Sequence, residues 1–288
     1  MEPFMDHDPA GFECFDTASG RVHVSPDFRD AAEGLSLRRF GEAMAFIGGE
    51  TVDSNRKRSV VRVEWGGRAF FLKRFTRPPA KDALFQLLRG RRPRTHAEVE
   101  MEMIRAFRAA GFDAPEVAAW GEESGRGLRR RSFLLTAGLR DALPLPLYVE
   151  RNADALRKPS ARGAFIGALA GFVRGMHDAG LADPDLYSYH VFVRGAPSQP
   201  SFAIIDLHRA LKREASSLLD SARDLTALHL TMPPAFASRT DKVRFLLRYF
   251  RIGTMSPAAR RLARKILKRS KRIGERKKFA ALFPKKKP

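Results

Sequence analysis

Short apolar runs, rich in β-branched and aromatic residues, dominate the first half of the chain. Five such runs stand out, and a Gly66-Gly67 pair between the second and third is typical of a hairpin turn. Their length and composition predict five antiparallel strands in one small lobe. The runs are 45–52, 59–65, 69–75, 116–120 and 132–136.

Helical periodicity takes over in the second half. Apolar positions repeat at helical spacing over 164–179, which ends before Gly180, and again over 218–230 and 240–250. In the first half, 95–111 has this pattern, and residues 1 to about 40 contain a short helical pattern. We therefore predict an α+β fold of two lobes: a small five-stranded antiparallel lobe with one helix, and a mainly helical lobe.

Changes in texture divide the chain into four parts. Residues 1–44 mix turn residues with acidic ones and contain no readable motif, so they are interpreted as an N-terminal cap. The small lobe is assigned to 45–137 and the helical lobe to 138–255. A basic tail follows at 256–288.

Charge is concentrated in that tail. The chain has a net charge of +21, and residues 257–288 contribute +13 of it, with 14 Lys or Arg against one acidic residue, Glu275. Leu262, Ile266 and Ile273 fall near one face of a helix whose other positions are basic, which favours a segment lying on an anionic membrane surface. A solvated tail that only raises solubility is the alternative.

The same tail has few aromatic residues. Only Phe279 and Phe283 interrupt the basic positions, so no stacking platform for bases is formed and no specific nucleic-acid partner is expected. Electrostatic binding without sequence preference stays open. The sequence does not indicate an oligomeric state.

Several features favour a cytoplasmic location. The single cysteine, Cys14, excludes an internal disulfide and a cysteine-based zinc site. The N-terminus lacks a basic region followed by an apolar core, and the longest uncharged apolar run, 163–173, is short of the roughly 20 residues that span a bilayer. Together with the tail, this predicts a peripheral protein on the inner face of the cytoplasmic membrane.

A lysine and a glutamate are candidates for a phosphate-binding pair. Lys73 shares a strand face with Phe71 and Phe75, so its ammonium group leaves an apolar surface and needs an anionic partner. Glu100 lies on the inward stripe of the helix at 95–111, whereas Glu98 and Glu102 are assigned to a solvated face. A lysine that only reaches water from an edge strand is an equal alternative.

Two aspartates bracket a predicted hairpin in the helical lobe. Asp185 precedes the apolar run 191–193, and Asp206 follows the run 202–205, with turn residues between the runs. Phosphoryl transfer of the protein-kinase type uses a loop aspartate as base, a metal ligand five residues on, and a second metal-binding aspartate after the next strand. Asp185, His190 and Asp206 match that spacing. Turn aspartates and helix caps are the plainer interpretation.

These motifs together resemble the bacterial lipopolysaccharide core kinase family, the Kdo and heptose kinases with a protein-kinase-like fold. The resemblance covers about residues 21–230. It rests on five segments: Phe71-Leu-Lys-Arg74, Ala97-Glu-Val-Glu100 leading to Gly111-Phe-Asp-Ala-Pro115, Met176-His-Asp-Ala-Gly180, Asp185-Leu-Tyr-Ser-Tyr-His190 and Ile205-Asp-Leu-His-Arg209.

The resemblance implies an ATP-dependent enzyme that uses Mg²⁺ and phosphorylates a sugar hydroxyl of the lipopolysaccharide inner core. By that likeness, Lys73 contacts the nucleotide phosphates and Glu100 orients it. Asp185 is the catalytic base, and His190 with Asp206 holds the magnesium ion.

The loop departs from the usual kinase pattern at one point. Asp183-Pro184 stands where most kinases have His-Arg. The altered loop leaves open a weakened or inactive enzyme. A kinase for another small hydroxylated molecule is kept as an alternative, as is a non-catalytic pseudokinase that binds an anionic membrane or nucleic acid through the basic tail. Asp224 is interpreted as a buried anchor for the loop or as a surface residue of its helix.

Overall fold

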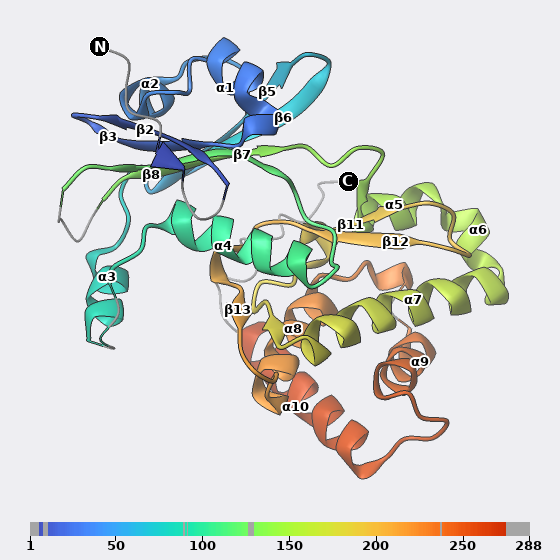
Figure 1. The fold of residues 1–288 in the computed structure, drawn as a ribbon. Helices are drawn as coiled ribbons and strands as arrows, with labels where there is room; N and C mark the ends of the chain where they lie inside the picture. Colours follow the sequence, from blue (N-terminus) through green and yellow to red (C-terminus); the bar gives the residue numbers. More distant parts are fainter. Residues whose placement is uncertain are drawn as a thin grey trace. The chain divides into compact units, whose positions relative to one another are not determined.

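The computed structural model describes residues 6–7, 11–88, 90, 92–125, 130–236 and 238–274. The chain forms two compact units (Figure 1). Unit 1 comprises Met1–Arg108 and Ala114–Arg140, and unit 2 comprises Ala109–Asp113 and Asp141–Pro288.

Unit 1 is built on one antiparallel sheet. Its strand order is β1-β2-β3-β7-β8-β6-β5-β4, and Trp65 pairs with Arg68 across the predicted glycine turn. The strands are β1 (Asp6–His7), β2 (Glu13–Thr17), β3 (Gly20–Val24), β4 (Glu50–Ser54), β5 (Arg58–Trp65), β6 (Arg68–Phe75), β7 (Val117–Glu123) and β8 (Ser132–Ala137).

Four of the five predicted strands lie near their predicted bounds, whereas the first, predicted at 45–52, begins only at Glu50 as β4. The predicted strand number is wrong, because β1, β2 and β3 extend the sheet to eight. Buried polar side chains concealed this pattern. Glu13 is buried and forms an ion pair with Arg29, and His23 is stacked on Trp120 with ring centroids 4.0 Å apart. Such polar positions read as loop in a sequence, although each has a partner in the folded protein.

Unit 1 also has more than the one predicted helix. The helices are α1 (Arg29–Gly34), α2 (Phe40–Ala45), α3 (Ala80–Leu87) and α4 (His96–Ala109). The first two have six residues each, too few to display a helical period. They cover one face of the sheet, and α4 covers the other (Figure 1).

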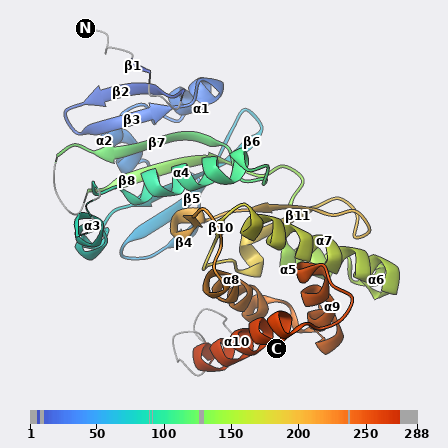
Figure 2. The same cartoon turned by 60° about the horizontal axis from the view of Figure 1, so that its bottom comes forward.

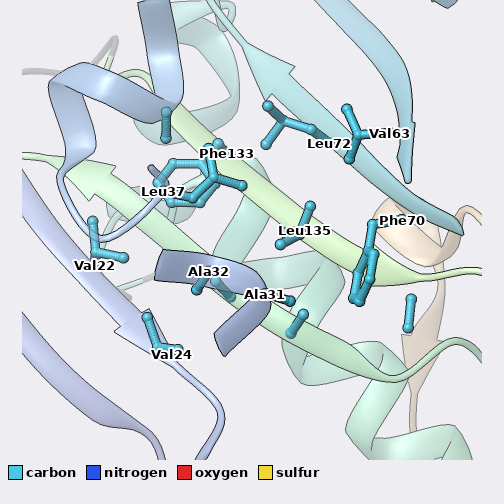
Figure 3. Packing of buried hydrophobic residues seen from close by; sticks show 14 of the residues in the cluster. Val22, Val24, Ala31, Ala32, Leu37, Val63, Phe70, Leu72, Phe133 and Leu135 are labelled. Atoms are coloured by element: carbon cyan, nitrogen blue, oxygen red, sulfur yellow. The ribbon is translucent and has the colours of Figure 1, made fainter. Parts of the chain in front are cut away.

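The core of unit 1 lies between the sheet and the two short helices. Phe70 and Leu72 of β6 point into it, together with Leu37 (Figure 3). Phe40 belongs to the same cluster, and all four residues are at most 2% exposed. Since side chains alternate along a strand, Lys73 faces the opposite side, toward α4. The sheet thereby places one lysine of β6 on the face that α4 covers.

Unit 2 is mainly helical, as predicted. Phe165 lies at the centre of its aromatic core, stacked on Tyr148 and in edge contact with Phe202 and Phe236. The helices are α5 (Leu145–Arg151), α6 (Ala153–Arg157), α7 (Pro159–Asp178), α8 (Leu218–Thr231), α9 (Arg239–Phe250) and α10 (Pro257–Gly274). The strands are β9 (Leu143–Pro144), β10 (Leu181–Ala182), β11 (Val191–Arg194), β12 (Ser201–Ile204) and β13 (Leu211–Lys212).

The predicted hairpin of unit 2 is confirmed. Strands β11 and β12 pair in antiparallel register, with Val191 opposite Ile204 and Arg194 opposite Ser201. Strand β9 pairs with the other edge of β11. The hairpin therefore carries His190 at the start of one strand and Asp206 just beyond the end of the other.

The apolar face of helix α10 packs against the rest of unit 2. Leu262 is fully buried and Ile266 is 8% exposed, and the helix packs beside α8 (Figure 2). The expectation that this face lies on a membrane is therefore wrong for these two residues. Seven basic side chains of α10 are exposed, together with the apolar Leu267. The basic residues are Arg260, Arg261, Arg264, Lys265, Lys268, Lys271 and Arg272. Residues 275–288 of the predicted tail lie outside the described residues.

Among the helices that the structure describes, none is both long enough and apolar enough to cross a bilayer.

An ion pair ties α7 to the start of α9. Asp241 is buried, caps α9 together with Ser238, and accepts hydrogen bonds from Arg162 at 3.0 and 2.6 Å. Burial alone would raise the pKa of Asp241, but the hydrogen bonds from Arg162 and Ser238 hold it below its usual value. The charged form of Asp241 thus stabilises the fold.

We predict that Arg162→Ala lowers the free energy of unfolding by about 2 kcal/mol near neutral pH, because it leaves a buried carboxylate without its cation; the fully buried case would cost more. Since the folded-state pKa of Asp241 is lowered, this contribution is present above the unfolded pKa of about 3.9 and is lost as pH falls through the folded pKa. Urea unfolding at several pH values measures both effects.

Arg157→Ala is the matched control, since the ion pair of Arg157 with Asp154 is exposed on both sides and should contribute nothing measurable. An equal effect of the two substitutions, or a pH-independent effect of Arg162→Ala, would contradict the assignment.

Candidate active site

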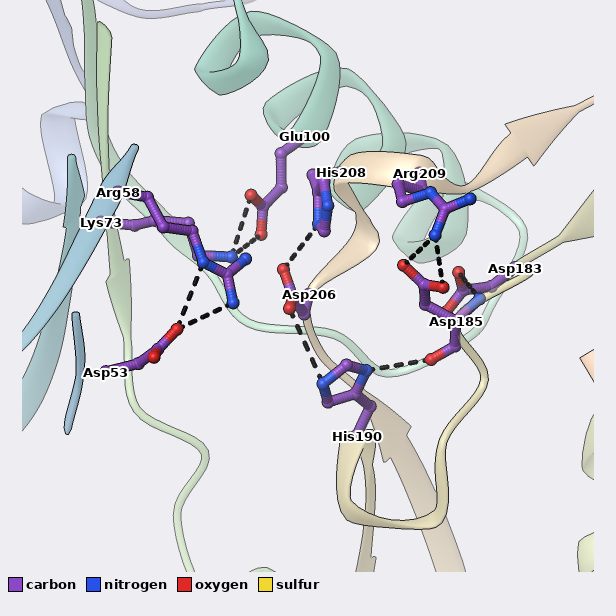
Figure 4. Close-up of polar contacts among 10 residues, drawn as sticks. All are labelled: Asp53, Arg58, Lys73, Glu100, Asp183, Asp185, His190, Asp206, His208 and Arg209. Carbon is purple, nitrogen blue, oxygen red and sulfur yellow. Dashed lines mark hydrogen bonds and ion pairs between the residues drawn. The ribbon is translucent and has the colours of Figure 1, made fainter. Parts of the chain in front are cut away.

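In unit 1, Lys73 and Glu100 form a shielded ion pair. The Nζ atom of Lys73 donates to both carboxylate oxygens of Glu100, at 2.7 and 3.0 Å (Figure 4). The lysine side chain is 13% exposed and the glutamate 3%. The structure thus brings together the two residues that the sequence predicted to form a phosphate-binding pair.

The pairing follows from local structure. Alternation along β6 turns Lys73 toward α4, while the next residue, Arg74, points to the opposite face and donates to the carbonyl oxygens of Met44 and Phe46. On α4, the inward stripe carries Glu100 with Ile104. A lysine held by both oxygens of a buried carboxylate keeps a fixed position from which its ammonium group can contact an anion.

Glu98 differs from its prediction. It was assigned to a solvated face, yet it is 3% exposed and forms an ion pair with Arg92. Burial raises the pKa of the Glu98 carboxyl, and Arg92 opposes that shift. Glu102 is less buried and pairs with Arg94.

In unit 2, Asp185 lies in a tightly held loop between β10 and the 3₁₀ turn Ser188–His190. The loop is fixed mostly through its backbone: the Ser188 amide donates to the Thr231 hydroxyl of α8 at 2.7 Å, and the Ser188 hydroxyl donates to the Thr231 carbonyl at 2.5 Å. Leu186 is fully buried. The 7% exposed Asp185 side chain is therefore presented from a rigid support.

Arg209 contacts Asp185 directly. Its Nη1 atom donates to both carboxylate oxygens, at 2.8 and 3.0 Å, while 58% of the arginine side chain is exposed (Figure 4). The sequence gave Arg209 no role. The available signal was its place in the Ile205–Arg209 motif, three residues after the candidate metal ligand Asp206.

His190 is oriented by the same loop. Its Nδ1 atom lies 3.0 Å from the backbone carbonyl oxygen of Asp185, and since a carbonyl only accepts, Nδ1 must carry the proton. In the neutral ring, Nε2 is then the atom with the lone pair, and it faces a carboxylate oxygen of Asp206 at 3.7 Å. That distance is too long for a hydrogen bond and leaves the two atoms as neighbouring ligand donors.

Asp206 is itself held in an uncommon conformation. Its backbone is left-handed, with φ at +61°, a region that aspartate tolerates better than most residues. His208, two residues on, bonds the second carboxylate oxygen at 2.8 Å. An imidazole nitrogen and a hydrogen-bonded carboxylate fit a divalent cation that completes its shell with water or phosphate oxygens, as Mg²⁺ does.

Asp224 is the buried anchor that the sequence allowed for. It is 1% exposed, and its Oδ2 atom accepts the backbone amide of Asp183 at 2.7 Å and lies 3.0 Å from Nε2 of His177. The other ring nitrogen of His177 lies 2.7 Å from the hydroxyl of Tyr249. This network links α7, α8 and α9 to the start of the Asp185 loop.

The predicted site residues therefore form one group in each unit. Lys73 and Glu100 meet in unit 1, and Asp185, His190 and Asp206 gather around one loop in unit 2. The side chains of each group have the chemical character that their predicted roles require, and the roles themselves stay predictions.

Comparisons with known proteins point the same way. Residues 46–249 match the model of the lipopolysaccharide kinase (Kdo/WaaP) family. Lipopolysaccharide core heptose(I) kinase WaaP of Pseudomonas aeruginosa is 28% identical over 214 residues, 73% of this chain and 80% of the relative. The WaaP protein of Escherichia coli K12 is 29% identical over 211 residues, 71% and 78% of the two chains.

A solved structure, WaaP in complex with acyl carrier protein, has a TM-score of 0.66 and 24% identity, and the match covers 88% of this chain and 98% of that one. This likeness confirms the predicted protein-kinase-like fold. Because the family match spans well over half of the chain, this protein is a member of the lipopolysaccharide kinase (Kdo/WaaP) family and a kinase with an alcohol group as acceptor.

Proposed function

We propose that this protein transfers the γ-phosphate of ATP, with Mg²⁺, to a sugar hydroxyl of the lipopolysaccharide inner core, a Kdo or a heptose. The observation that carries the proposal is the loop of unit 2. There the Asp185 side chain is presented by a rigid turn whose own backbone carbonyl orients His190 toward Asp206.

Asp185 is the proposed base. Its carboxylate receives the proton of the acceptor hydroxyl as the oxygen attacks phosphorus, and Arg209 fixes the orientation of both carboxylate oxygens. The exposure of Arg209 is compatible with an acceptor that arrives from solvent. The loop contributes positioning, which is the larger part of catalysis in phosphoryl transfer.

Lys73 is proposed to contact the nucleotide phosphates, with Glu100 keeping its ammonium group in place. His190 and Asp206 would hold the magnesium ion, which supplies charge neutralisation for the phosphate oxygens when bound. The curated relatives are named as heptose(I) kinases, which favours a heptose as acceptor. A pseudokinase is disfavoured, since the residues proposed as the catalytic base, as the metal ligands and as the phosphate-binding lysine are all present.

We predict that Asp185→Asn lowers turnover by about a thousand-fold or more, because the amide cannot accept the hydroxyl proton. Purified protein would be incubated with ATP, Mg²⁺ and a panel of core glycolipids and soluble core sugars, and the product identified by mass spectrometry. Wild-type protein that phosphorylates no member of the panel would refute the proposed function.

Asp178→Asn is the matched control, an aspartate on α7 paired with Arg174 at the surface, and it should keep full activity. Equal turnover of folded Asp185→Asn and wild type would remove Asp185 from the role of base.

For the metal, we predict that Asp206→Ala raises the Mg²⁺ concentration needed for half-maximal activity by at least about ten-fold, because the cation loses its carboxylate ligand. Calorimetric titration of the nucleotide with and without a chelator measures the same loss in binding. Asp154→Ala, an exposed aspartate of α6, serves as control. Nucleotide binding that responds neither to chelator nor to Asp206→Ala would contradict the metal assignment.

The membrane partner is proposed on charge alone. Seven Lys or Arg side chains of α10 are exposed, while Leu262 and Ile266 of its apolar face are buried, so contact with the inner leaflet would be mainly electrostatic. Each basic residue near an anionic bilayer contributes about 1 kcal/mol. This face would hold the enzyme at the cytoplasmic membrane surface, where a lipid-linked acceptor is available.

We predict that replacing Arg264, Lys268 and Lys271 by Glu weakens binding to anionic vesicles at low salt by about a hundred-fold, while the fold persists because these side chains are exposed. The same reversal at Arg39, Arg56 and Lys57, exposed residues of unit 1, is the control. Unchanged vesicle sedimentation would exclude the membrane, and a selective loss of binding to purified acyl carrier protein would identify a different anionic partner.

A further inference from the structure

Two buried carboxylate oxygens beside the catalytic loop have no hydrogen-bond partner within the described part of the chain. They are Oδ2 of Asp183 and Oδ1 of Asp224. Asp183 has no exposed surface and Asp224 is 1% exposed. The two side chains are neighbours, since Asp224 Oδ2 accepts the Asp183 backbone amide at 2.7 Å. Two buried acceptors without a donor, on residues that are joined by a hydrogen bond, call for a donor.

In the described part of the chain, the charges around Asp183 disfavour a negative charge on its carboxyl group. The charged side chains that act on Asp183 are Asp224, Asp185 and Asp206, and all are acidic. Burial raises the pKa of the Asp183 carboxyl well above its usual value, and these three carboxylates raise it further. Adjacent carboxylates in a dry interior cannot both ionise, and a single proton between them resolves the conflict.

The contacts also indicate which residue carries the proton. Asp224 Oδ2 accepts the Asp183 amide and lies 3.0 Å from Nε2 of His177, so this oxygen already has two partners. Asp183 Oδ1 accepts only the Asp185 amide, at 3.0 Å. Asp183, whose pKa is raised by burial, is therefore the residue of the pair that carries the proton.

We propose that Asp183 and Asp224 share one proton, in an O–H···O hydrogen bond from Asp183 Oδ2 to Asp224 Oδ1, and that this bond fixes the loop that presents Asp185. Asp183 is thus a positioning residue. Kinases usually have a histidine at this position, and a protonated aspartate also supplies a donor there, which an ionised one could not.

The positioning role rests on the proposed function of Asp185, whereas the shared proton does not. The other titratable groups in contact with the pair are His177 from α7 and, through it, Tyr249 from α9. On the loop side are Asp185, with Arg209 bound to it, and Asp206. Substitutions at Asp183 itself separate its proton from these neighbours.

The decisive test is the pH dependence of unfolding of the full chain. Because the pKa of Asp183 is raised by folding, its stability contribution is complete below the unfolded value of about 3.9 and declines as pH rises toward the folded value. In Asp183→Asn, the amide donates to Asp224 without a titratable proton. Between the unfolded and the folded pKa of Asp183, the ratio of the two unfolding constants is expected to change by about ten-fold per pH unit, in favour of the variant.

Asp220→Asn provides a control of opposite sign. Burial would raise the pKa of Asp220, but hydrogen bonds from Ser217 and the nearby Arg213 and Arg223 hold it below its usual value. Its stabilising effect should therefore be lost as pH falls. Should Asp183→Asn not fold, Asp224→Asn makes the same test, because its amide donates to Asp183 and leaves no shared proton.

Two further readouts complete the experiment. Difference infrared spectra should show the carbonyl stretch of a protonated carboxyl group in wild type near neutral pH and not in Asp183→Asn. Turnover should stay within a few-fold of wild type in Asp183→Asn and fall much further in Asp183→Ala, which has no donor.

Wild type and Asp183→Asn with the same pH dependence of unfolding, or a protonated carboxyl band that persists in the variant, would overturn the shared proton. Equal turnover of the Ala and Asn variants would overturn the positioning role. A wild-type protein without kinase activity would instead refute the proposed function, and the unfolding and infrared results would still decide the proton.

Discussion

The bond between the Asp224 carboxylate and the Asp183 backbone amide is the contact on which the candidate site of unit 2 depends. It fixes where the loop leaves β10, and the Ser188 contacts with Thr231 fix where it reaches β11. Both anchors come from α8, so one buried helix sets both ends of the segment that carries Asp185. A loop that is fixed at both ends keeps the reacting group in place, and this matters because small displacements of a reacting group lower the reaction rate strongly.

Between these two anchors, the polar groups orient one another through hydrogen bonds. The Asp185 carbonyl orients His190, Arg209 orients the Asp185 carboxylate, and His208 orients Asp206. Each residue that is predicted to act as the base or as a metal ligand thus has a supporting partner from the same short stretch of chain. Arg209 and His208 escaped prediction because no pattern of spacing distinguishes a supporting residue from an ordinary surface arginine or histidine.

Sequence reasoning succeeded where a single physical rule dominates. The alternation of β6 and the stripe of α4 place Lys73 and Glu100 correctly, and the hairpin around Arg194 and Ser201 follows from turn chemistry. It failed where burial is shared with polar groups, as in β2 and β3, whose Glu13 and His23 find partners only in the folded sheet. It also failed for α10, because an amphipathic pattern does not say whether Leu262 meets a membrane or a neighbouring helix.

The unusual Asp183-Pro184 pair is compatible with an intact loop for a structural reason. Asp224 binds the backbone amide of residue 183, and Thr231 binds the backbone and hydroxyl of Ser188, so these two anchors use neither the side chain of residue 183 nor residue 184. The proposed bond from the Asp183 carboxyl group adds a third anchor. Proline has no amide hydrogen, and the Asp185 amide next to it bonds the Asp183 carboxyl. The substitution therefore changes the local donor while the backbone path to Asp185 is kept.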